Sequence, residues 1–476
     1  MMLNNPLVTI VPITLQAKTC ITQIFQHYSH KSWAMLLDSS SSEHENGQYD
    51  IMVANPLATI TTKGNYSEVT HYNNSKECSN DNPLALLQKL SNQYLSEVEL
   101  ASSVDLPFII GALGYFGYDL GRRFETLPNK NADEYHTPDM AIGIYSWSII
   151  KDNLSDCFYL CYLDDYPHPS QSEIESLASS NYESQKFTLK SKWQANMSKA
   201  AYKQKIAAIK SYLKAGDCYQ TNLAQRFTAS YEGDEWHAYL NLRRENKAPF
   251  SAFIRLSHSS ILSISPERFL LVKNKNVETK PIKGTRPRQL EAIADKAQIQ
   301  SLLSSSKDKA ENLMIVDLLR NDLSKHCEAG TVAVPELFKI ETFTSVHHLV
   351  SKVTAKLKSD KTAIDLLQGA FPGGSITGAP KIRAMEIIEE LEPNNRNIYC
   401  GSIGYLGIKG DMDTSICIRS LLCEQATIEN KIHCWAGGGI VVDSLADDEY
   451  QESLDKVSKI LPILDADLPK KHPKNI

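Results

Sequence analysis

Short runs rich in β-branched and aromatic residues recur through the first third of the chain, between turn-forming residues. They are LVTIVPITL (7–15), WAMLLD (33–38), DIMVANPLATITT (50–62), AIGIYSWSII (141–150) and CFYLCYL (157–163). This pattern predicts β-strands. A glycine-rich segment at 108–125 interrupts them without the GxGxxG spacing of a dinucleotide-binding loop, so we interpret its glycines as sites of close backbone packing.

The pattern changes beyond about residue 198, where helices and strands are mixed. Ser198 can cap a helix whose apolar stripe is Tyr202, Ile206, Ile209 and Leu213 and which Gly216 would end. Strands are predicted at CYQTNLAQRFTA (218–229), FSAFIRL (250–256), SILSISP (260–266), RFLLVK (268–273), CGSIGYLGI (400–408), SICIRSLLC (415–423) and KIHCWAGGGIVV (431–442). Many strands with few β-α-β alternations indicate an α+β fold with large antiparallel or mixed sheets and helices outside.

A polar segment separates the two stretches. Residues 166–197 are rich in serine and asparagine and poor in apolar periodicity, which predicts a linker or loop. The predicted organisation is therefore an N-terminal region at 1–165, the linker at 166–197, a catalytic region at 198–464 and a tail at 465–476.

Composition narrows the classes of function. The chain has 476 residues, 42% hydrophobic and 22% charged, with a net charge of -6, which argues against nucleic acid as the main partner. It has no apolar run of about twenty residues, so we expect no membrane span. Its ten cysteines form no CxxC pair and are expected to be reduced, which favours the cytoplasm.

Two predicted helices carry carboxylates at one-turn spacing. In KDKAENLMIVDLLRNDL (307–323), Asp308 and Glu311 share a face, and in DDEYQESLDKVSKIL (447–461), Glu449 and Glu452 do so together with Lys456. Two such faces could hold one Mg²⁺, which prefers oxygen ligands and keeps several waters. The spacing alone equally fits a solvated acidic surface.

A glycine run precedes the second of these helices. Gly437, Gly438 and Gly439 could expose successive backbone N–H groups as an anion-binding nest, with Arg419 and Lys456 adding positive charge. Together with carboxylates around a cation, this set suits a small dicarboxylate. A β-bulge or a tight turn would also explain the glycines. The segment PGGSITGAPK (372–381) does not have P-loop spacing, so nucleotide binding is excluded there.

Lys283 and Glu267 are candidates for chemistry that their local sequence does not decide. Lys283 lies in TKPIKGTRPR between a strand-like segment and a turn; it would be a nucleophile only if burial or a nearby cation lowered its pKa. Glu267 in SISPERFL would be an ordinary ion-pair residue unless it lay in a pocket. An exposed lysine and a paired glutamate are the alternatives.

The ordered set of motifs resembles one family, the chorismate-utilising enzymes. The matching segments are GDCYQTNL, SPERFL, PIKGTRPR, KDKAENLMIVDLLRND, VHHLVS, PGGSITGAPK, GSIGYLG, CIRS, AGGGIV and DDEYQE, over about 198–464, with weaker matches in WAMLLDS and GYFGYD. The resemblance implies an α/β sandwich of two large, mostly antiparallel sheets packed face to face, with helices outside. It also implies chorismate as substrate and Mg²⁺ as cofactor.

The resemblance assigns roles position by position. Glu311 and Glu449 correspond to the direct metal ligands, and Asp308 and Glu452 to the secondary ones. Glu267 corresponds to the general acid that protonates the departing hydroxyl at ring carbon 4. His348 corresponds to the catalytic-site histidine. The implied contacts to substrate are Ser375, Tyr405, Arg419, the backbone of Gly437, Gly438 and Gly439, and Lys456.

Two positions distinguish activities within the family. Family members that add water carry a lysine where this chain has Gln220, so the resemblance implies an amine nucleophile. Anthranilate synthases carry alanine where this chain has Lys283, whereas lysine is typical of members that aminate ring carbon 4. The implied product is 4-amino-4-deoxychorismate, for 4-aminobenzoate and folate, formed through a lysine adduct at carbon 2.

The resemblance also implies a partner. The chain contains no recognisable glutaminase nucleophile motif, so a separate glutamine amidotransferase subunit is expected to supply ammonia. Residues 36–39 read LLDS rather than the LLES of feedback-inhibited anthranilate synthases, which leaves a structural tryptophan in the N-terminal region open. Anthranilate synthase, isochorismate synthase and a non-catalytic chorismate-binding paralogue are the competing interpretations.

Overall fold

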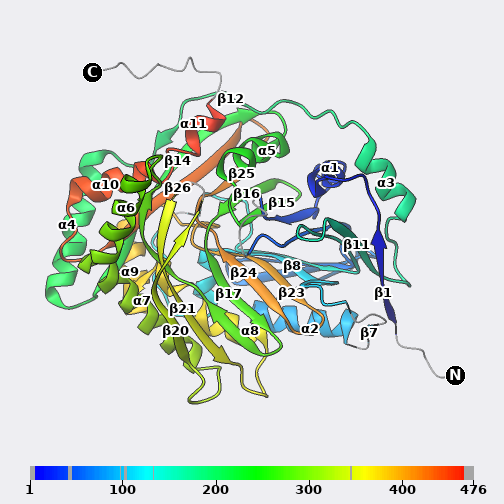
Figure 1. Cartoon of the computed structure of the whole chain (residues 1–476), viewed down its shortest axis with the longest axis horizontal. Helices are drawn as coiled ribbons and strands as arrows, with labels where there is room; N and C mark the ends of the chain where they lie inside the picture. The colour runs from blue at the N-terminus through cyan, green and yellow to red at the C-terminus, as the bar shows by residue number, and fades with distance from the viewer. Residues whose placement is uncertain are drawn as a thin grey trace.

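Two large β-sheets form the body of the molecule. The computed structural model describes residues 6–40, 46–96, 98–100, 104–131, 133–343 and 346–465. Both the N-terminal and the catalytic stretches contribute strands to each sheet, so the expectation of one sandwich built from both is confirmed. Figure 1 shows N-terminal strands continuing the sheets formed by the later strands.

The larger sheet is antiparallel except for the short parallel pair β1–β7. Its strands, in spatial order, are β12 (Thr188–Leu189), β14 (Gln220–Glu232), β26 (Asn430–Ile440), β25 (Ser420–Glu424), β16 (Ser259–Ser265), β15 (Phe250–Arg255), β2 (Met35–Asp38), β3 (Tyr49–Val53), β10 (Trp147–Asp152), β11 (Cys157–Leu163), β1 (Leu7–Ile13) and β7 (Glu99–Leu100). Two short strands, β13 (Gln194–Ala195) and β22 (Gly378–Ala379), also pair with β14.

The smaller sheet is antiparallel throughout its described pairs. Its strands, in spatial order, are β19 (Ile282–Pro287), β21 (Val346–Lys356), β18 (Asn276–Thr279), β17 (Arg268–Lys273), β24 (Met412–Ile416), β23 (Ser402–Gly407), β8 (Gly111–Phe116), β9 (Met140–Tyr145), β4 (Ala58–Lys63), β5 (Tyr66–His71) and β6 (Lys76–Ser79), with β20 (Ala333–Thr342) also paired with β21.

Helices cover the outer faces of the sheets. They are α1 (Ile21–Phe25), α2 (Pro83–Leu95), α3 (Gln171–Ser179), α4 (Lys199–Ala215), α5 (Glu235–Asn246), α6 (Ala292–Ser304), α7 (Ser306–Ser324), α8 (Ala363–Ala370), α9 (Lys381–Leu391), α10 (Ala446–Asp455) and α11 (Leu461–Leu464), with 3₁₀ turns at Tyr118–Arg123 and Gly374–Ile376. In Figure 1, α4, α6, α7, α9 and α10 gather at the left of the view. Among the helices of the described ranges, none has the length and hydropathy needed to cross a bilayer.

Strand alternation builds two cores from one sheet. Met35 of β2 packs with Leu113 and Ile144 of the smaller sheet, while the next residue, Leu36, packs against Phe25 of α1 on the opposite face. Successive strand residues point to opposite faces, so the larger sheet is apolar on both sides. The sheets are therefore packed face to face with helices outside, and the predicted fold class is confirmed.

The predicted linker was only partly correct. Helix α4 begins at the cap Ser198 and ends at Gly216, whose φ is 83°, as predicted. Within 166–197, however, residues Gln171–Ser179 form α3. Ser170 and Glu173 form a capping box and Ile174 is buried, so a local cap and one apolar contact compensate for the weak periodicity. The predicted tail, 465–476, lies outside the described residues except for Asp465.

The predicted strand SICIRSLLC is two strands in different sheets. β24 ends at Ile416 in the smaller sheet, and β25 begins at Ser420 in the larger one. Arg419 adopts φ 54°, and this left-handed turn redirects the chain. A run of strand-forming residues carries no sign of such a crossing, because both halves have the same composition.

Candidate active site

Two chain crossings place Glu267 and Arg419 together. β16 ends at Ser265 in the larger sheet and β17 begins at Arg268 in the smaller one, so Glu267 lies in a second crossing. The crossings bond to each other's strands: the N–H of Ile416 donates to the carbonyl of Glu267 at 3.0 Å, and that of Ile264 to the carbonyl of Arg419 at 3.1 Å. Both side chains therefore lie where the chain passes between the sheets.

Glu267 is buried in surroundings that suit a general acid. The hydroxyl of Ser375 donates to Glu267 Oε1 at 3.2 Å. Burial raises the pKa of Glu267 from 4.5 to about 7, although Lys283, the Ser375 hydroxyl, the N–H of Ile282 and Arg419 all oppose that rise. A carboxyl with this pKa holds its proton for part of the time near neutral pH and can donate it.

Lys283 lies beside this acid on edge strand β19. Its ammonium donates to the carbonyl oxygen of Ser375 at 3.1 Å. Desolvation lowers the pKa of Lys283, and Lys456 contributes in the same direction, while Glu311 and Glu267 oppose the change. The lysine thus becomes neutral, and nucleophilic, more readily than an exposed lysine.

Helices α7 and α10 direct carboxylates toward a common region. Glu449 accepts a hydrogen bond from Ser444 Oγ at 2.6 Å and lies 3.6 Å from Lys307 Nζ. Burial raises the pKa of Glu311, and the charge of Glu449 adds to that rise, so the two helices bring their acids close enough to repel each other. Burial likewise raises the pKa of Glu449, with a contribution from Glu452.

The carboxylates provide the oxygen donors that a divalent cation prefers, but they are not arranged as a preformed ligand set. Within the described part of the chain, no three His, Cys, Asp or Glu side chains converge as a ligand set. Lysines provide the positive charge instead: Lys456 Nζ lies 2.7 Å from Glu452 Oε1, and Lys307 pairs with Glu449. Mutually repelling carboxylates on facing helices are the oxygen donors that a hard cation requires.

Asp308 occupies a different position in this group. Its carboxylate pairs with Arg286 at 3.0 Å, and the amide N–H of Asp308 donates to Ser305 Oγ, the cap at the start of α7. Gly284 leaves the space beside it, because a Cβ there would lie 3.0 Å from Asp308 Cγ. The structure therefore joins Asp308 to strand β19 rather than to the carboxylates of α10.

The predicted glycine nest is wrong. Gly437, Gly438 and Gly439 lie in β26 in unbroken register with Ala224, Leu223 and Asn222 of β14, and none of the three has a positive φ. A nest needs alternating left-handed residues, and the bulge or turn alternative is excluded by the same regular register. The three glycines are ordinary residues of strand β26, and what distinguishes them is the space left by their missing side chains.

That space is occupied by the charged side chains of α10. A Cβ on Gly438 would lie 3.3 Å from Glu452 Oε1 and 3.5 Å from both Glu449 Oε2 and Lys456 Nζ. The carbonyl of Gly437 accepts from Lys456 Nζ at 2.8 Å, so its backbone groups point away from β14. Backbone groups two residues apart along a strand point in the same direction, so the N–H of Gly439 also points away from β14. The pairing of β26 with β25 ends at Cys434, so β25 does not cover this edge of the strand at Gly439.

Gln220 and His348 flank this region. Gln220 Nε2 donates to Asn222 Oδ1 at 3.3 Å, and a Cβ on Gly439 would lie 2.4 Å from that nitrogen, so the glycine makes room for the amide. His348 on β21 bonds through Nδ1 to Thr285 Oγ1 at 2.8 Å, two residues along β19 from Lys283. Both side chains are buried.

Tyr405 is not brought to this cluster. It lies on β23 against Phe108, with ring centroids 5.3 Å apart, and lines a separate pocket with Tyr49, Arg268 and Asp413. None of the other predicted site residues lines that pocket. Its position at the middle of β23, paired with Leu113 and Asp413, directs it there, and the predicted contact with substrate at Tyr405 has no support from its place in the fold.

Two residues of the cluster were not predicted. Lys307 lies one helical turn before Glu311, so the i, i+4 spacing could have placed the two on one face of α7. Its ion pair with Glu449 joins two helices and has no such signal in the sequence. Ser444, which binds Glu449, lies in the loop between β26 and α10. No periodic signal marks such a loop serine.

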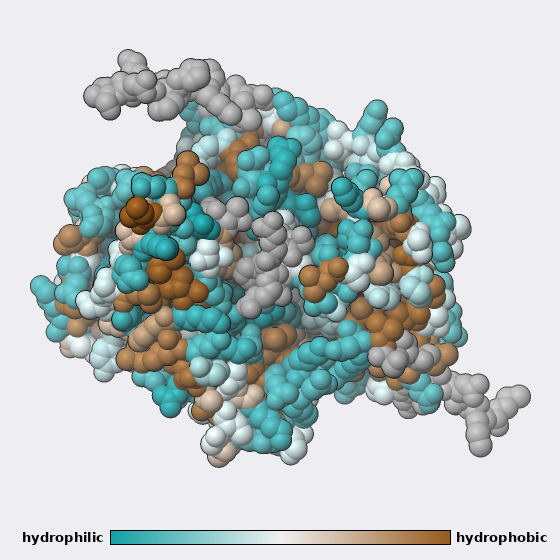
Figure 2. All heavy atoms as spheres, in the orientation of Figure 1, coloured by the Kyte–Doolittle hydropathy of each residue, from teal (hydrophilic) through white to brown (hydrophobic). Residues whose placement is uncertain are grey.

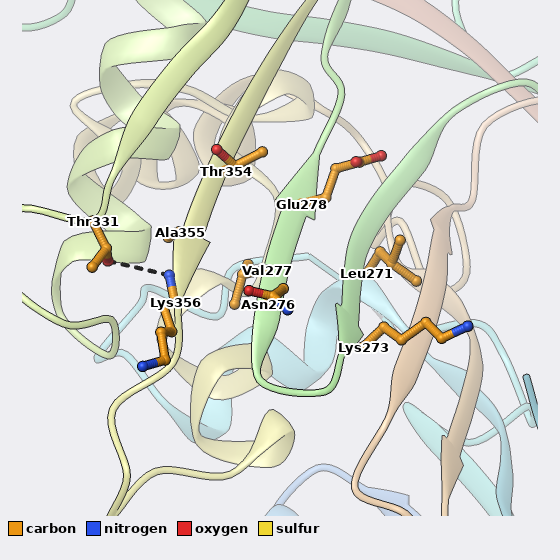
Figure 3. Close-up of a pocket in the computed structure, with 9 residues that line it drawn as sticks. All are labelled: Leu271, Lys273, Asn276, Val277, Glu278, Thr331, Thr354, Ala355 and Lys356. Atoms are coloured by element: carbon orange, nitrogen blue, oxygen red, sulfur yellow. Dashed lines mark hydrogen bonds between the residues drawn. The ribbon is translucent and has the colours of Figure 1, made fainter.

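A hollow on the smaller sheet lies apart from the cluster. Figure 3 shows it over β17, β18 and β21, with Lys273 and Glu278 along one side and the Thr331 hydroxyl bonded to the backbone N–H of Lys356. Its charged side chains are already paired: Lys273 with Asp105, Glu278 with Lys352 and Lys356 with Glu328. No residue predicted for the site lines it.

The exposed face in Figure 2 is mostly hydrophilic, with separate hydrophobic patches.

Comparisons with known proteins agree on one family. The family profile described as chorismate binding enzyme matches residues 34–462. Aminodeoxychorismate synthase component 1 of Escherichia coli (strain K12) is 50% identical over 441 residues, which is 93% of this chain and 95% of that protein. Anthranilate synthase component 1 of Lactococcus lactis is 35% identical over 439 residues, covering 90% and 94%. The crystal structure of anthranilate synthase component I from Streptococcus pneumoniae TIGR4 superposes with a TM-score of 0.74 at 30% identity, covering 87% of this chain and 92% of that one.

Proposed function

Because the chain belongs to the chorismate-binding enzymes, we propose that it aminates chorismate at ring carbon 4 and yields 4-amino-4-deoxychorismate. The observation that carries the proposal is the placement of Lys283 beside Glu267, both in contact with Ser375. Substitution of a ring hydroxyl needs a nucleophile and an acid that protonates the leaving group, and Ser375 holds a lysine and a carboxylic acid side by side. The Escherichia coli relative named aminodeoxychorismate synthase component 1 is 50% identical to the chain, whereas the Lactococcus lactis relative named anthranilate synthase component 1 is 35% identical.

The substrate's two carboxylates have distinct cationic and amide partners. Arg419 at the sheet crossing provides a guanidinium beside Glu267, and Lys456 lies next to the open backbone edge of Gly437 and Gly439. Arginine binds carboxylates through two parallel N–H groups, and a strand edge adds fixed N–H donors. The ring would then lie between them, with carbon 4 toward Glu267.

The chemistry divides one difficult substitution into two displacements. Neutral Lys283 adds through Nζ at carbon 2; both conjugated ring double bonds shift, the bond from carbon 4 to its hydroxyl breaks, and Glu267 gives its proton so that water leaves. Ammonia then adds at carbon 4, the two double bonds shift back, and the bond between carbon 2 and Lys283 breaks, so that Lys283 leaves as the neutral amine and a proton from the new ammonium group restores Glu267. The lowered pKa of Lys283 and the raised pKa of Glu267 shift each group toward the protonation state that the first step requires.

We extend the proposal to Mg²⁺, held by Glu311 and Glu449 directly, with Glu452 and Asp308 assisting through water. When bound, the ion would neutralise a substrate carboxylate and stabilise developing negative charge. Lys307 and Lys456, which pair with these acids in the structure, have to release them for metal ligation.

Ammonia is proposed to come from a glutamine amidotransferase subunit. The relatives are named as component 1, which supports the existence of a second component. The pocket lined by Leu37, Asp38, Tyr49 and Phe250 contains part of the LLDS segment, and we propose it as the place of a structural tryptophan. A cytoplasmic location is supported by the ten cysteines, which are all free thiols.

Product analysis tests the proposal. The purified chain would be incubated with chorismate, Mg²⁺ and an ammonium salt at alkaline pH, and the product identified by mass spectrometry against standards. 4-Amino-4-deoxychorismate with its enolpyruvyl group retained is the expected product. Anthranilate with free pyruvate would show that Lys283 does not divert the reaction to carbon 4.

A further inference from the structure

A buried ion pair lies behind the proposed site without contacting any residue assigned to substrate or metal. Arg396 and Glu392 are 2% and 5% exposed. The guanidinium binds the carboxylate with two parallel hydrogen bonds, Nε to Oε2 at 2.9 Å and Nη2 to Oε1 at 2.7 Å. The rings of Tyr118 and Tyr399 lie against the guanidinium at 4.8 and 5.6 Å. The pair is therefore rigid and completely enclosed.

Each member of the pair makes one further hydrogen bond to an element of the proposed site. Glu392 Oε1 accepts the N–H of Ala224 at 2.8 Å, and Ala224 lies opposite Gly437 in the register of β14 and β26. Arg396 Nη1 donates to the carbonyl of Ile376 at 3.1 Å. The pair thus connects the glycine strand to the 3₁₀ turn Gly374–Ile376.

That turn carries the residue on which the proposed chemistry depends. Ser375 donates to Glu267 through its hydroxyl and accepts from Lys283 through its carbonyl, and it is the direct neighbour of Ile376. A second connection runs from the N–H of Asn222 to the carbonyl of Thr377 at 2.8 Å. The C-terminal end of the turn is consequently held against β14 by two connections.

We propose that Glu392 and Arg396 are positioning residues, which hold the Ser375 turn at a fixed distance from strand β14 so that Ser375 contacts Glu267 and Lys283 at once. This inference rests on the proposed function. A buried ion pair is in itself weak evidence for stability, because well-packed apolar residues are often as stable in its place. Its two directed bonds, one to Ala224 of β14 and one to Ile376 of the turn, are what apolar residues could not supply.

The inference predicts how Glu267 responds to changes in the pair. Arg396→Lys keeps the charge but removes the guanidinium's parallel bonds and the bond to Ile376. The charged or titratable groups that face Glu267 are Lys283, Arg419 and the thiol of Cys400. When the turn loosens, the hydrogen bond from Ser375 to the Glu267 carboxylate weakens, so the charged form loses support and the proton is held more tightly.

The matched control is Arg255→Lys. Arg255 is also buried in ion pairs, with Glu235 and Asp234, but it lies on β15 and contacts none of the site elements. For both variants we would measure denaturant unfolding, kcat and KM over pH with ammonia as nitrogen source, and the infrared band of the protonated Glu267 carboxyl, assigned with Glu267→Gln. The infrared titration needs no turnover and therefore separates failure of this inference from failure of the proposed reaction.

Arg396→Lys is expected to lower kcat by about tenfold or more with little change in KM, and to move the Glu267 titration to higher pH. Arg255→Lys should lose stability with its Glu267 titration unchanged. In the double variant Ser375→Ala with Arg396→Lys, the shift should equal that of Ser375→Ala alone, because the arginine acts through the serine. A Glu267 titration at the wild-type pH in Arg396→Lys, or additive shifts in the double variant, would overturn the inference.

Discussion

Lys283 donates its ammonium to the carbonyl oxygen of Ser375 across 3.1 Å. The same serine donates its hydroxyl to Glu267, so one residue orients the proposed nucleophile and the proposed acid. Both reacting groups are therefore oriented by a single residue, through its backbone carbonyl on one side and its side-chain hydroxyl on the other.

Replacing Lys283 by methionine should nearly abolish amination while chorismate still binds. The change keeps the side-chain length but removes the amine that forms the adduct, so kcat should fall by about a thousandfold or more and the chorismate Kd should change by less than about threefold. Steady-state kinetics and equilibrium binding measure the two effects separately.

The control for this variant is Lys275→Met. Lys275 also donates to backbone carbonyls, with 3.0 Å to that of Ser359, but it lies on the turn between β17 and β18. It should retain normal kcat. Equal loss in both variants, or loss of binding alone in Lys283→Met, would argue against a covalent role.

The pH dependence of turnover should report Glu267. Its pKa is raised by burial to about 7, and the reaction requires the protonated acid. The specificity constant for chorismate, kcat/KM, should therefore decline as pH rises through about 7. This decline on the alkaline side of the pH profile should be missing from the small residual activity of Glu267→Gln. An unchanged limb in the variant would assign the titration to another group.

Stability should report the same carboxyl, and it should also decrease as pH rises. The folded protein holds the Glu267 proton up to about pH 7, whereas the unfolded chain releases it near 4.5, so wild-type stability decreases as pH rises between these values. Glu267→Gln lacks this penalty. The difference in the free energy of unfolding, variant minus wild type, should therefore increase by up to about 3 kcal/mol between pH ~5 and pH ~8, as measured by denaturant titration.

Local sequence predicted most elements but not how they meet. The α4 helix with its caps at Ser198 and Gly216 follows from short-range rules, and the carboxylate spacing of α7 and α10 was readable because helix geometry fixes it. The crossings at Glu267 and Arg419 were not, because a strand and a strand that changes sheets have the same composition. The extended conformation of Gly437 depends on pairing with β14, which is more than two hundred residues earlier in the chain.

The family resemblance also transferred one residue that the structure places elsewhere. Tyr405 lies in the family motif GSIGYLG, but strand alternation on β23 and its pairing with β8 direct it to the pocket of Tyr49 and Arg268. Sequence distance from a motif does not determine the face of a strand on which a side chain lies.

Neutralising one acid should weaken metal binding without unfolding the chain. Glu311→Gln removes a charged oxygen ligand, and it also relieves repulsion from Asp308 and Glu449 in the metal-free protein. Calorimetric titration with Mg²⁺ in the presence of chorismate should show affinity reduced by about tenfold or more, with thermal stability unchanged or increased.

Asp317→Asn provides the control on the same helix. Asp317 is exposed and pairs only with Arg320 in the described contacts, at 2.8 Å. Its Mg²⁺ affinity should equal that of wild type. Wild-type affinity in Glu311→Gln as well would remove Glu311 from the metal site.

Adding one methyl group at Gly438 should disturb the charged cluster while leaving the sheet intact. The new Cβ would lie 3.3 to 3.5 Å from Glu452, Glu449 and Lys456, which are the ends of flexible side chains and can move aside, and φ at this glycine is compatible with alanine. Gly438→Ala should therefore fold with normal stability, yet bind chorismate and Mg²⁺ about tenfold more weakly, because Glu449 and Lys456 are displaced. Gly407→Ala on β23 is the matched control, since its Cβ would meet nothing closer than 3.8 Å. Normal ligand affinity in Gly438→Ala would mean that the glycine is required only by the strand, and that the acids of α10 act at a distance from β26.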